Sequence, residues 1–134
     1  MSIINYTSYF HDGSLINIIH HNSVIIFSIE SAEISAEENL DNILLSDHST
    51  IKGKLHLEEV ESVKENGKPF LANLKMLHDS AGILHLNIRD NTINLDLEWV
   101  NFPPHPEVSA YSFYSIQAKK IWWENIPDLF DPFC

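Results

Sequence analysis

Two histidine–aspartate pairs are the residues whose types and spacing could support chemistry in this chain of 134 residues. His11 and Asp12 stand just ahead of one apolar segment, and His78 and Asp79 stand just ahead of another. A histidine beside a carboxylate can act as a general base or supply half of a metal site. Each pair is also an ordinary turn signal, because Asp followed by Gly or Ser commonly begins a turn. If the two pairs meet at one end of a sheet, they would form a composite site for a metal ion or a small ligand.

The rest of the chain offers no recognisable catalytic signature. Eight histidines are present, but none follows the HxH or HExxH spacing of metal enzymes. The single cysteine, Cys134, is the last residue, and no GxSxG motif of a nucleophilic serine occurs. The four glycines are isolated, which excludes a glycine-rich phosphate-binding loop. We therefore lean toward a protein that is not an enzyme, and we expect no cofactor.

The clearest structural element that could position these residues is a β-hairpin over residues 82–102. Apolar and polar residues alternate on both sides of Asp90-Asn91, and both of these side chains tolerate positive φ in a two-residue loop. With that loop, the predicted cross-strand pairs are Arg89/Thr92, Ile88/Ile93, Leu86/Leu95 and Leu84/Leu97. A slip of one residue would turn every apolar side chain to the wrong face, so the pattern specifies the register.

The remaining elements are also predominantly β. Further strands are predicted over residues 14–31, 50–63, 70–77 and 112–123, with turns near His21-Asn22 and at Asn66-Gly67. The alternation breaks at Glu59-Val60, which predicts a β-bulge. A capping-box spacing and helical apolar intervals predict at most one short helix, near residues 36–45.

These elements predict an all-β fold, an antiparallel β-sandwich or flattened barrel of about seven to nine strands built from hairpins. The length suits a single domain over residues 1–134. The two strands within residues 14–31 are apolar on both faces, which predicts a doubly covered position. The predicted core consists of Ile16, Ile18, Ile25, Phe27, Leu55, Leu57, Leu84, Leu86, Ile88, Ile93, Leu95, Leu97, Trp99, Ile116 and Trp123.

Negative charge is concentrated in the first part of the chain. The formal net charge is −11 at pH 7, and residues 1–51 contain no Lys or Arg. Such a field repels phosphate backbones, which argues against binding to nucleic acid. The same field would attract a basic protein partner. The acidic residues expected to contact that partner are Glu30, Glu33, Glu37, Glu38 and Asp41.

The sequence also bears on the compartment. Its longest apolar run, from Val24 to Phe27, is too short to span a bilayer. The first ten residues lack the basic and apolar regions of a signal peptide. One cysteine allows no internal disulfide, which fits a reducing environment. We expect a cytoplasmic protein with no membrane partner.

An aromatic block lies near the C-terminus, within residues 121–133. Trp122 and Trp123 are adjacent on a predicted strand over residues 112–123, so they must point to opposite faces. One of them can fill the core; the other, which we take to be Trp122, would contact a partner. Either tryptophan, together with an edge strand, would also suit a homodimer interface. The tail after Pro127 is predicted to fold back over an open end of the β core, because it would otherwise expose a large apolar patch.

Several segments of the chain resemble a known group of proteins. FHDGSLINI at residues 10–18, IKGKLHLEEV followed by NGKPF, and IWWENIPDLFDPF near the end resemble small bacterial all-β proteins of uncharacterised function. The chain is also similar to compact acidic immunity proteins, which neutralise toxins. This resemblance implies a non-enzymatic inhibitor and carries no catalytic residues.

The leading hypothesis from the sequence is therefore a protein-binding module for a basic partner. One alternative is a metal-binding or small-ligand-binding protein that uses the His–Asp pairs. The other is a structural component of a homo-oligomer.

Overall fold

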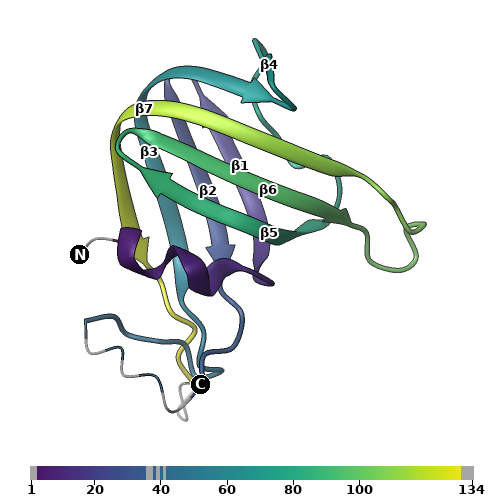
Figure 1. Ribbon diagram of the computed structural model, residues 1–134. Coiled ribbons are helices and arrows are strands. Elements are labelled where there is room, and N and C mark those ends of the chain that lie inside the picture. Colours follow the sequence, from purple (N-terminus) through teal and green to yellow (C-terminus); the bar gives the residue numbers. More distant parts are fainter. Residues whose placement is uncertain (1–2, 36–37, 39, 41, 131–134) are drawn as a thin grey trace.

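The described part of the chain forms a seven-stranded antiparallel sheet preceded by one short helix (Figure 1). The computed structural model describes residues 3–35, 38, 40 and 42–130. The elements are the 3-10 helix η1 (Ile4–Phe10) and the strands β1 (Ser14–His21), β2 (Val24–Glu30), β3 (Lys52–Glu65), β4 (Lys68–Pro69), β5 (Ser80–Arg89), β6 (Thr92–Val100) and β7 (Tyr111–Asn125). In the part of the chain that is described, no helix has the length and apolar character needed to cross a membrane.

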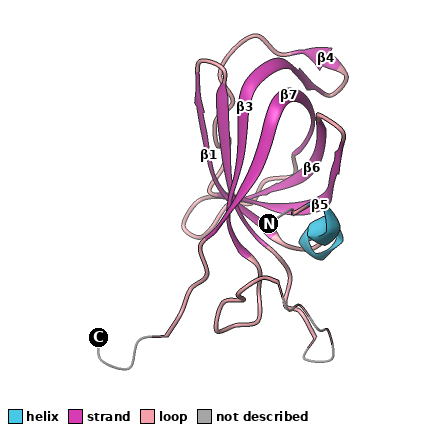
Figure 2. Ribbon diagram, turned by 90° about the vertical axis from the view of Figure 1, so that its left-hand side faces the viewer, coloured by secondary structure: helices cyan, strands magenta, loops and turns pink. Residues whose placement is uncertain are grey.

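Six of the strands close into a barrel. The strand order is β2-β1-β5-β6-β7-β3-β4, and β2 also pairs with β3, which joins the sheet to itself. The short strand β4 is an outer strand, bonded only to the end of β3. Figures 1 and 2 show the strands curving around a common interior, with η1 crossing one end against β5. The predicted all-β fold is confirmed, and the architecture is a barrel rather than a sandwich.

The β5–β6 hairpin has most of the predicted register. Three of the four predicted pairs occur, namely Arg89–Thr92, Ile88–Ile93 and Leu86–Leu95. The fourth is wrong, because the register shifts at Leu84 and places Ile83 opposite Leu97. A bulge inserts one extra residue into a strand, and two adjacent apolar residues hide that insertion from the alternation pattern.

The predicted core is correct except at two positions. The confirmed core residues are Ile18, Ile25, Phe27, Leu55, Leu57, Leu86, Ile88, Ile93, Leu95, Leu97, Trp99, Ile116 and Trp123. Leu84 is only half-buried, and Ile16 is 42% exposed because β1 also has a register shift there. Ile19 is exposed as well, so the double coverage predicted for β1 and β2 is wrong. A barrel has one interior, and the outer faces of these strands meet solvent.

The helix prediction is wrong in position. Residues 36, 37, 39 and 41 lie outside the described residues, and residues 38, 40 and 42–45 carry no helix. The helix that is described, η1, has no side-chain cap hydrogen bond at its first turn. Tertiary packing stabilises it instead: Phe10 is fully buried and its ring meets that of Trp123 edge-on, with centroids 5.8 Å apart.

Two of the predicted connections also differ from the structure. The first hairpin turns at Asn22-Ser23, one residue later than predicted, with Asn22 at φ 55°. Residues 70–77 form no strand: the pairing with β3 ends just after Pro69, with a last hydrogen bond of 2.9 Å from the Phe70 N–H to the Val63 carbonyl. The turn at Asn66-Gly67 is confirmed, and both residues have positive φ.

Strand β7 changes its inward face along its length. Tyr114 and Ala118 are buried in the core, and further along the strand Trp123 joins the same core. Strict alternation would place Trp123 on the face opposite Tyr114, so the alternation must break between Ala118 and Trp123. On the paired strand β3, Glu59 has φ 52° and the register shifts just after Val60, as the predicted bulge required. Bent strands of this kind allow a barrel to close.

The tail after Pro127 does not cover the core as far as it is described. The Asp128 backbone N–H donates to Ser46 Oγ, and the Asp47 N–H donates to the Asp128 carbonyl, each at 2.8 Å. The tail thus lies beside the loop that precedes β3, while Leu129 and Phe130 are exposed. The predicted covering role is not seen in these residues.

Candidate functional site

The first His–Asp pair forms a turn at the entrance to β1. His11 Nδ1 lies 2.5 Å from the carbonyl oxygen of Leu84, and its Nε2 lies 3.7 Å from Asp12 Oδ2. Asp12 has φ 68°, and its backbone N–H donates to the Ile83 carbonyl at 2.8 Å. Both side chains of the pair are mostly exposed to solvent. The pair therefore attaches the start of β1 to β5, which is the turn interpretation of these residues.

The second pair attaches the loop between β6 and β7 to the start of β5. Asp79 Oδ2 accepts hydrogen bonds from the Phe102 backbone N–H and from His105 Nδ1, both at 2.7 Å. These bonds, led by the one from Phe102, hold the pKa of Asp79 below its usual value. The ring of His78 packs at a tilt against Trp99, with centroids 6.0 Å apart. Asp79 is therefore a loop anchor in this structure.

The two pairs do not share their contacts. His11 bonds to β5, whereas Asp79 bonds to the β6–β7 loop. Among the described residues, no group of three or more His, Cys, Asp or Glu side chains could hold a metal ion. The structure instead brings His11 close to His85, because both line one cavity of about 320 Å³. Sequence spacing gave no sign of this juxtaposition.

The anchoring role of Asp79 predicts a pH-dependent loss of stability. A carboxyl group whose folded pKa is lowered stabilises the fold above its unfolded pKa, near 3.8, and loses that contribution as the pH falls through the folded pKa. Replacing Asp79 with Asn should therefore lower the urea midpoint at pH 7. The difference from the wild-type midpoint should shrink near pH 2.5. Asp12→Asn is the control, and an equal midpoint change in that variant would contradict the anchor role.

The acidic residues predicted to contact a partner are partly engaged within the fold. Glu30 Oε2 accepts a 2.6 Å hydrogen bond from Thr50 Oγ1. Glu38 accepts one from the Tyr9 hydroxyl at 3.0 Å, and this bond raises the pKa of Tyr9. Glu33 is exposed. The other two predicted residues, Glu37 and Asp41, lie outside the described residues.

Trp122 and Trp123 point to opposite faces of β7, as predicted. Trp123 is buried, whereas Trp122 is 39% exposed on the outside of the barrel. The indole of Trp122 stacks on His56, with ring centroids 3.8 Å apart, and its Nε1 donates to Glu58. His56 in turn lies 2.8 Å from Glu124. These contacts within the chain therefore already engage the Trp122 indole, and they leave less of its surface for contact with a partner.

A second exposed surface, which sequence reasoning missed, lies on the outside of β6 and β7. We call it the aromatic–acidic face, and its members are Asp96, Glu98, Val100, Tyr111 and Phe113. Glu98 pairs with Tyr111 and Asp96 with Phe113 across the two strands. The two rings stack with centroids 6.5 Å apart and planes at 4°. Among the described residues, neither carboxylate has an ion-pair or hydrogen-bond partner.

The surroundings of the aromatic–acidic face contain little positive charge. On the β5 side, the cross-strand partners of Asp96 and Glu98 are His85 and Gly82. Tyr111 and Phe113 are each nearly half exposed, and Phe102 in the adjoining loop is also exposed.

The alternation of exposed and buried residues in each strand was visible in the sequence. What the sequence lacked was the β6–β7 register, which decides that the carboxylates flank the rings.

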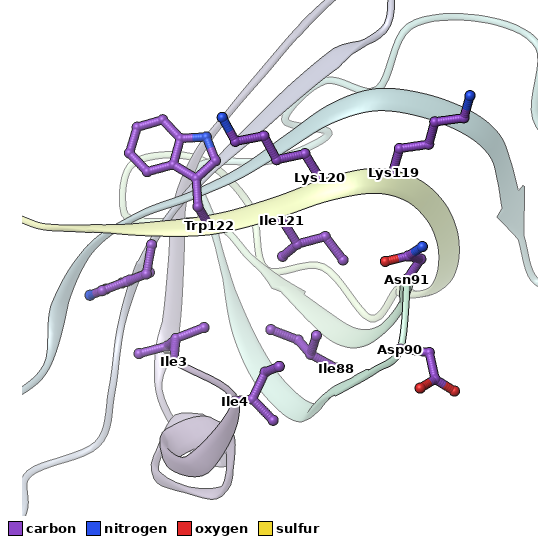
Figure 3. A pocket seen from close by; sticks show the side chains of 10 residues that line it. Ile3, Ile4, Ile88, Asp90, Asn91, Lys119, Lys120, Ile121 and Trp122 are labelled. Carbon is purple, nitrogen blue, oxygen red and sulfur yellow. The ribbon is translucent and has the colours of Figure 1, made fainter. Parts of the chain in front are cut away.

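A cavity of about 430 Å³ opens on the other side of β7, between η1 and the tip of the β5–β6 hairpin. Its lining residues are Ile3, Ile4, Ile88, Asp90, Asn91, Lys119, Lys120, Ile121, Trp122 and Trp123. Figure 3 shows Ile121 directed toward Ile3, Ile4 and Ile88, whereas Lys119 and Lys120 extend from the opposite side of the strand. The cavity thus has an aliphatic interior, and the side chains of Lys119 and Lys120 point away from it.

No protein-family model, no curated protein and no solved structure matches this chain.

Proposed function

We propose that this protein is a non-enzymatic binding module that docks a basic protein through the aromatic–acidic face, in the manner of an inhibitor or immunity-type protein. The observation that carries the proposal is the pair of unpartnered carboxylates, Asp96 and Glu98, beside the stacked rings of Tyr111 and Phe113. This surface replaces the acidic segment over residues 30–47 as the main expected contact.

The chemistry of the aromatic–acidic face suits arginine in particular. A guanidinium group can bond to a carboxylate in a planar, bidentate manner and stack on an aromatic ring at the same time. Tyrosine and arginine are also enriched among the residues that contribute most to protein–protein binding. A lysine would satisfy the charge but not the planar stacking. We therefore expect the partner to present arginine side chains.

The position of the face on the barrel favours tight binding. Both strands belong to the closed sheet, and β7 is paired with β6 on one side and β3 on the other. Side chains that are already ordered lose little conformational freedom on binding, which lowers the entropic cost of association. The outer surface around Trp122 is less suitable as a docking site. Its indole already stacks on His56 and donates a hydrogen bond to Glu58.

The net charge of the chain supports the same partner class. At −11 the protein attracts a basic partner over long distances, which speeds association at low ionic strength. Because the chain has a single cysteine, Cys134, it can form no internal disulfide. We therefore propose the reducing cytoplasm as its compartment.

The proposal can be tested before a partner is known, with a short peptide of alternating arginine and alanine as the probe. Titration into ¹⁵N-labelled protein should shift the backbone resonances of residues 96–98 and 111–113 most strongly. The shifts should weaken as salt is added, because the contact is charge-assisted. A lysine–alanine peptide of equal length should shift them less. Shifts centred on residues 33 and 38, or spread evenly over the barrel, would contradict the proposal.

A further inference from the structure

We propose that residues 70–79, which we call the strap, form a pH-sensitive closure of the barrel, and that His20 is the latch that holds the strap shut. The neutral ring of His20 accepts a hydrogen bond from the strap, and protonation of that ring would release it. The opened strap would uncover a gap in the barrel wall between β1 and β5. This inference goes beyond the proposed function and does not depend on it.

The strap lies where the barrel wall is incomplete. β1 and β5 pair at only two positions, Ser14–Gly82 and Leu15–Ala81. The rest of β1 pairs with β2 alone. Figure 1 shows the strap leaving β4 and descending to the start of β5, where Ser80 Oγ donates to the Leu15 carbonyl at 3.0 Å. The strap therefore borders the part of β1 that has no strand on its second side.

Side-chain packing, rather than a backbone ladder, holds the strap in place. Leu74 is buried in the core, and Met76 packs against the same core. Among the described residues, one hydrogen bond fastens the backbone of residues 71–78, from the Leu74 N–H to His20 Nδ1 at 2.8 Å. Segments with few backbone hydrogen bonds open at a lower free-energy cost than the strands of a sheet. His20 thus holds the strap at the point where Leu74 enters the core.

This hydrogen bond requires one protonation state of the His20 ring. A backbone N–H can only donate, so Nδ1 must carry no proton while the strap is closed, and the ring is neutral with its proton on Nε2. Burial lowers the pKa of His20 below its usual value of 6.5, and this effect outweighs a hydrogen bond with the Asn22 backbone, which acts in the opposite direction. A proton on Nδ1 would set two N–H donors against each other and abolish the bond.

The charged and titratable groups around His20 are few. On β2 its cross-strand partner is the apolar Ile25. Glu61 of β3 lines a cavity of about 330 Å³ together with His20, and its carboxylate would favour the charged ring. Lys75 in the strap and His21 on β1 are exposed neighbours that would disfavour it when charged. Among the described residues none of these groups forms an ion pair with His20, so burial is the main influence on its charge.

The direction of the pH effect follows from the two states of the strap. The closed strap favours the neutral ring, whereas the open strap exposes the ring to water, where its pKa is near 6.5. The open state therefore binds the proton more readily. The population of open strap should rise as the pH falls below 6.5, and the rise should end below the pKa of the closed state. Above pH 6.5 the closure keeps its full stability.

Hydrogen exchange of the Leu74 amide, followed by NMR between about pH 7.5 and pH 5.5, tests the latch. The protection factor, corrected for the intrinsic exchange rate, should fall with pH by up to about tenfold per pH unit, the limit for one linked proton. His20→Asn places an amide oxygen near the position of Nδ1, and this acceptor does not titrate. The variant should therefore abolish the pH dependence.

His21→Asn is the matched control, because it makes the same change at the neighbouring exposed ring, and it should keep the wild-type pH dependence. A wild-type protection factor that does not change with pH would overturn the latch, as would an unchanged pH dependence in His20→Asn. Equal protection of Leu74 and of the β6 amides, which lie in a strand paired on both sides, would overturn a local closure.

A measurement on the wild-type protein keeps the proposal testable if His20→Asn fails to fold. Long-range ¹H–¹⁵N spectra of the histidine rings distinguish a protonated from an unprotonated Nδ1. At pH 7.5 the ring of His20 should be neutral with an unprotonated Nδ1. A proton on Nδ1 at that pH would overturn the latch.

Discussion

Replacing Trp99 with Ala should destabilise the barrel by about 3–5 kcal/mol. Trp99 is 1% exposed and is among the largest fully buried side chains of the core. Its Nε1 donates a buried hydrogen bond to Ser112 Oγ at 2.8 Å, which links β6 to β7. The substitution leaves a cavity and removes that bond. Because small proteins have stabilities of about 5–15 kcal/mol, the loss would be a large share of the total.

Urea unfolding followed by circular dichroism measures this effect, and the other tryptophans of the chain provide a control. Trp122→Ala removes a side chain of the same size from the outside of the barrel and should cost clearly less, roughly 1–2 kcal/mol, through its stacking and hydrogen bond. Trp99→Phe should fall between the two. A loss below about 1 kcal/mol for Trp99→Ala would show that Trp99 does not support the core.

The sequence predicted the hairpins well because their signals are local. The β5–β6 register follows from strict alternation around a two-residue loop, and Asp90 adopts the positive φ that such a loop needs. Asn66-Gly67 is a turn for the same reason. Alternation also predicted most of the core. These features depend on residues close in the chain, where a pattern and its structural cause coincide.

The failures occur where the structure depends on distant contacts. Bulges at Ile16 and Leu84 add one residue to a strand, and an apolar neighbour at each bulge conceals the shift. Helix η1 has no capping signal and is stabilised by the packing of Phe10 against Trp123. Closure of β2 onto β3 is likewise a long-range pairing that no local pattern specifies.

For the candidate sites too, features set by neighbouring residues could be predicted from the sequence, and features set by distant contacts could not. His11 and Asp79 were singled out because each belongs to an adjacent His–Asp pair, yet one holds β5 and the other holds the loop at Phe102. The aromatic–acidic face was missed because its four central residues come from two strands. Their juxtaposition required the β6–β7 register, which the proline-containing connection between these strands leaves open.

The second large effect concerns partner capture. Asp96→Lys/Glu98→Lys reverses both carboxylates of the aromatic–acidic face, which should reduce capture of a basic partner roughly a hundredfold, because opposing charges in a contact are costly. Glu59→Lys/Glu61→Lys makes the same change in charge at two exposed positions on β3 and should retain the partner. Glu33→Lys/Glu38→Lys makes it in the originally predicted acidic segment and should also retain the partner.

The most direct test is therefore quantitative mass spectrometry of the proteins captured by these four baits, wild type and the three double variants, from one cell extract at physiological salt. Circular dichroism and urea midpoints must first show that each bait is folded. The account predicts that at least one basic protein is captured by wild type and by both control baits, and is lost only with Asp96→Lys/Glu98→Lys. A basic protein that is lost with Glu33→Lys/Glu38→Lys but retained with Asp96→Lys/Glu98→Lys would contradict it, as would capture that is the same for all four baits.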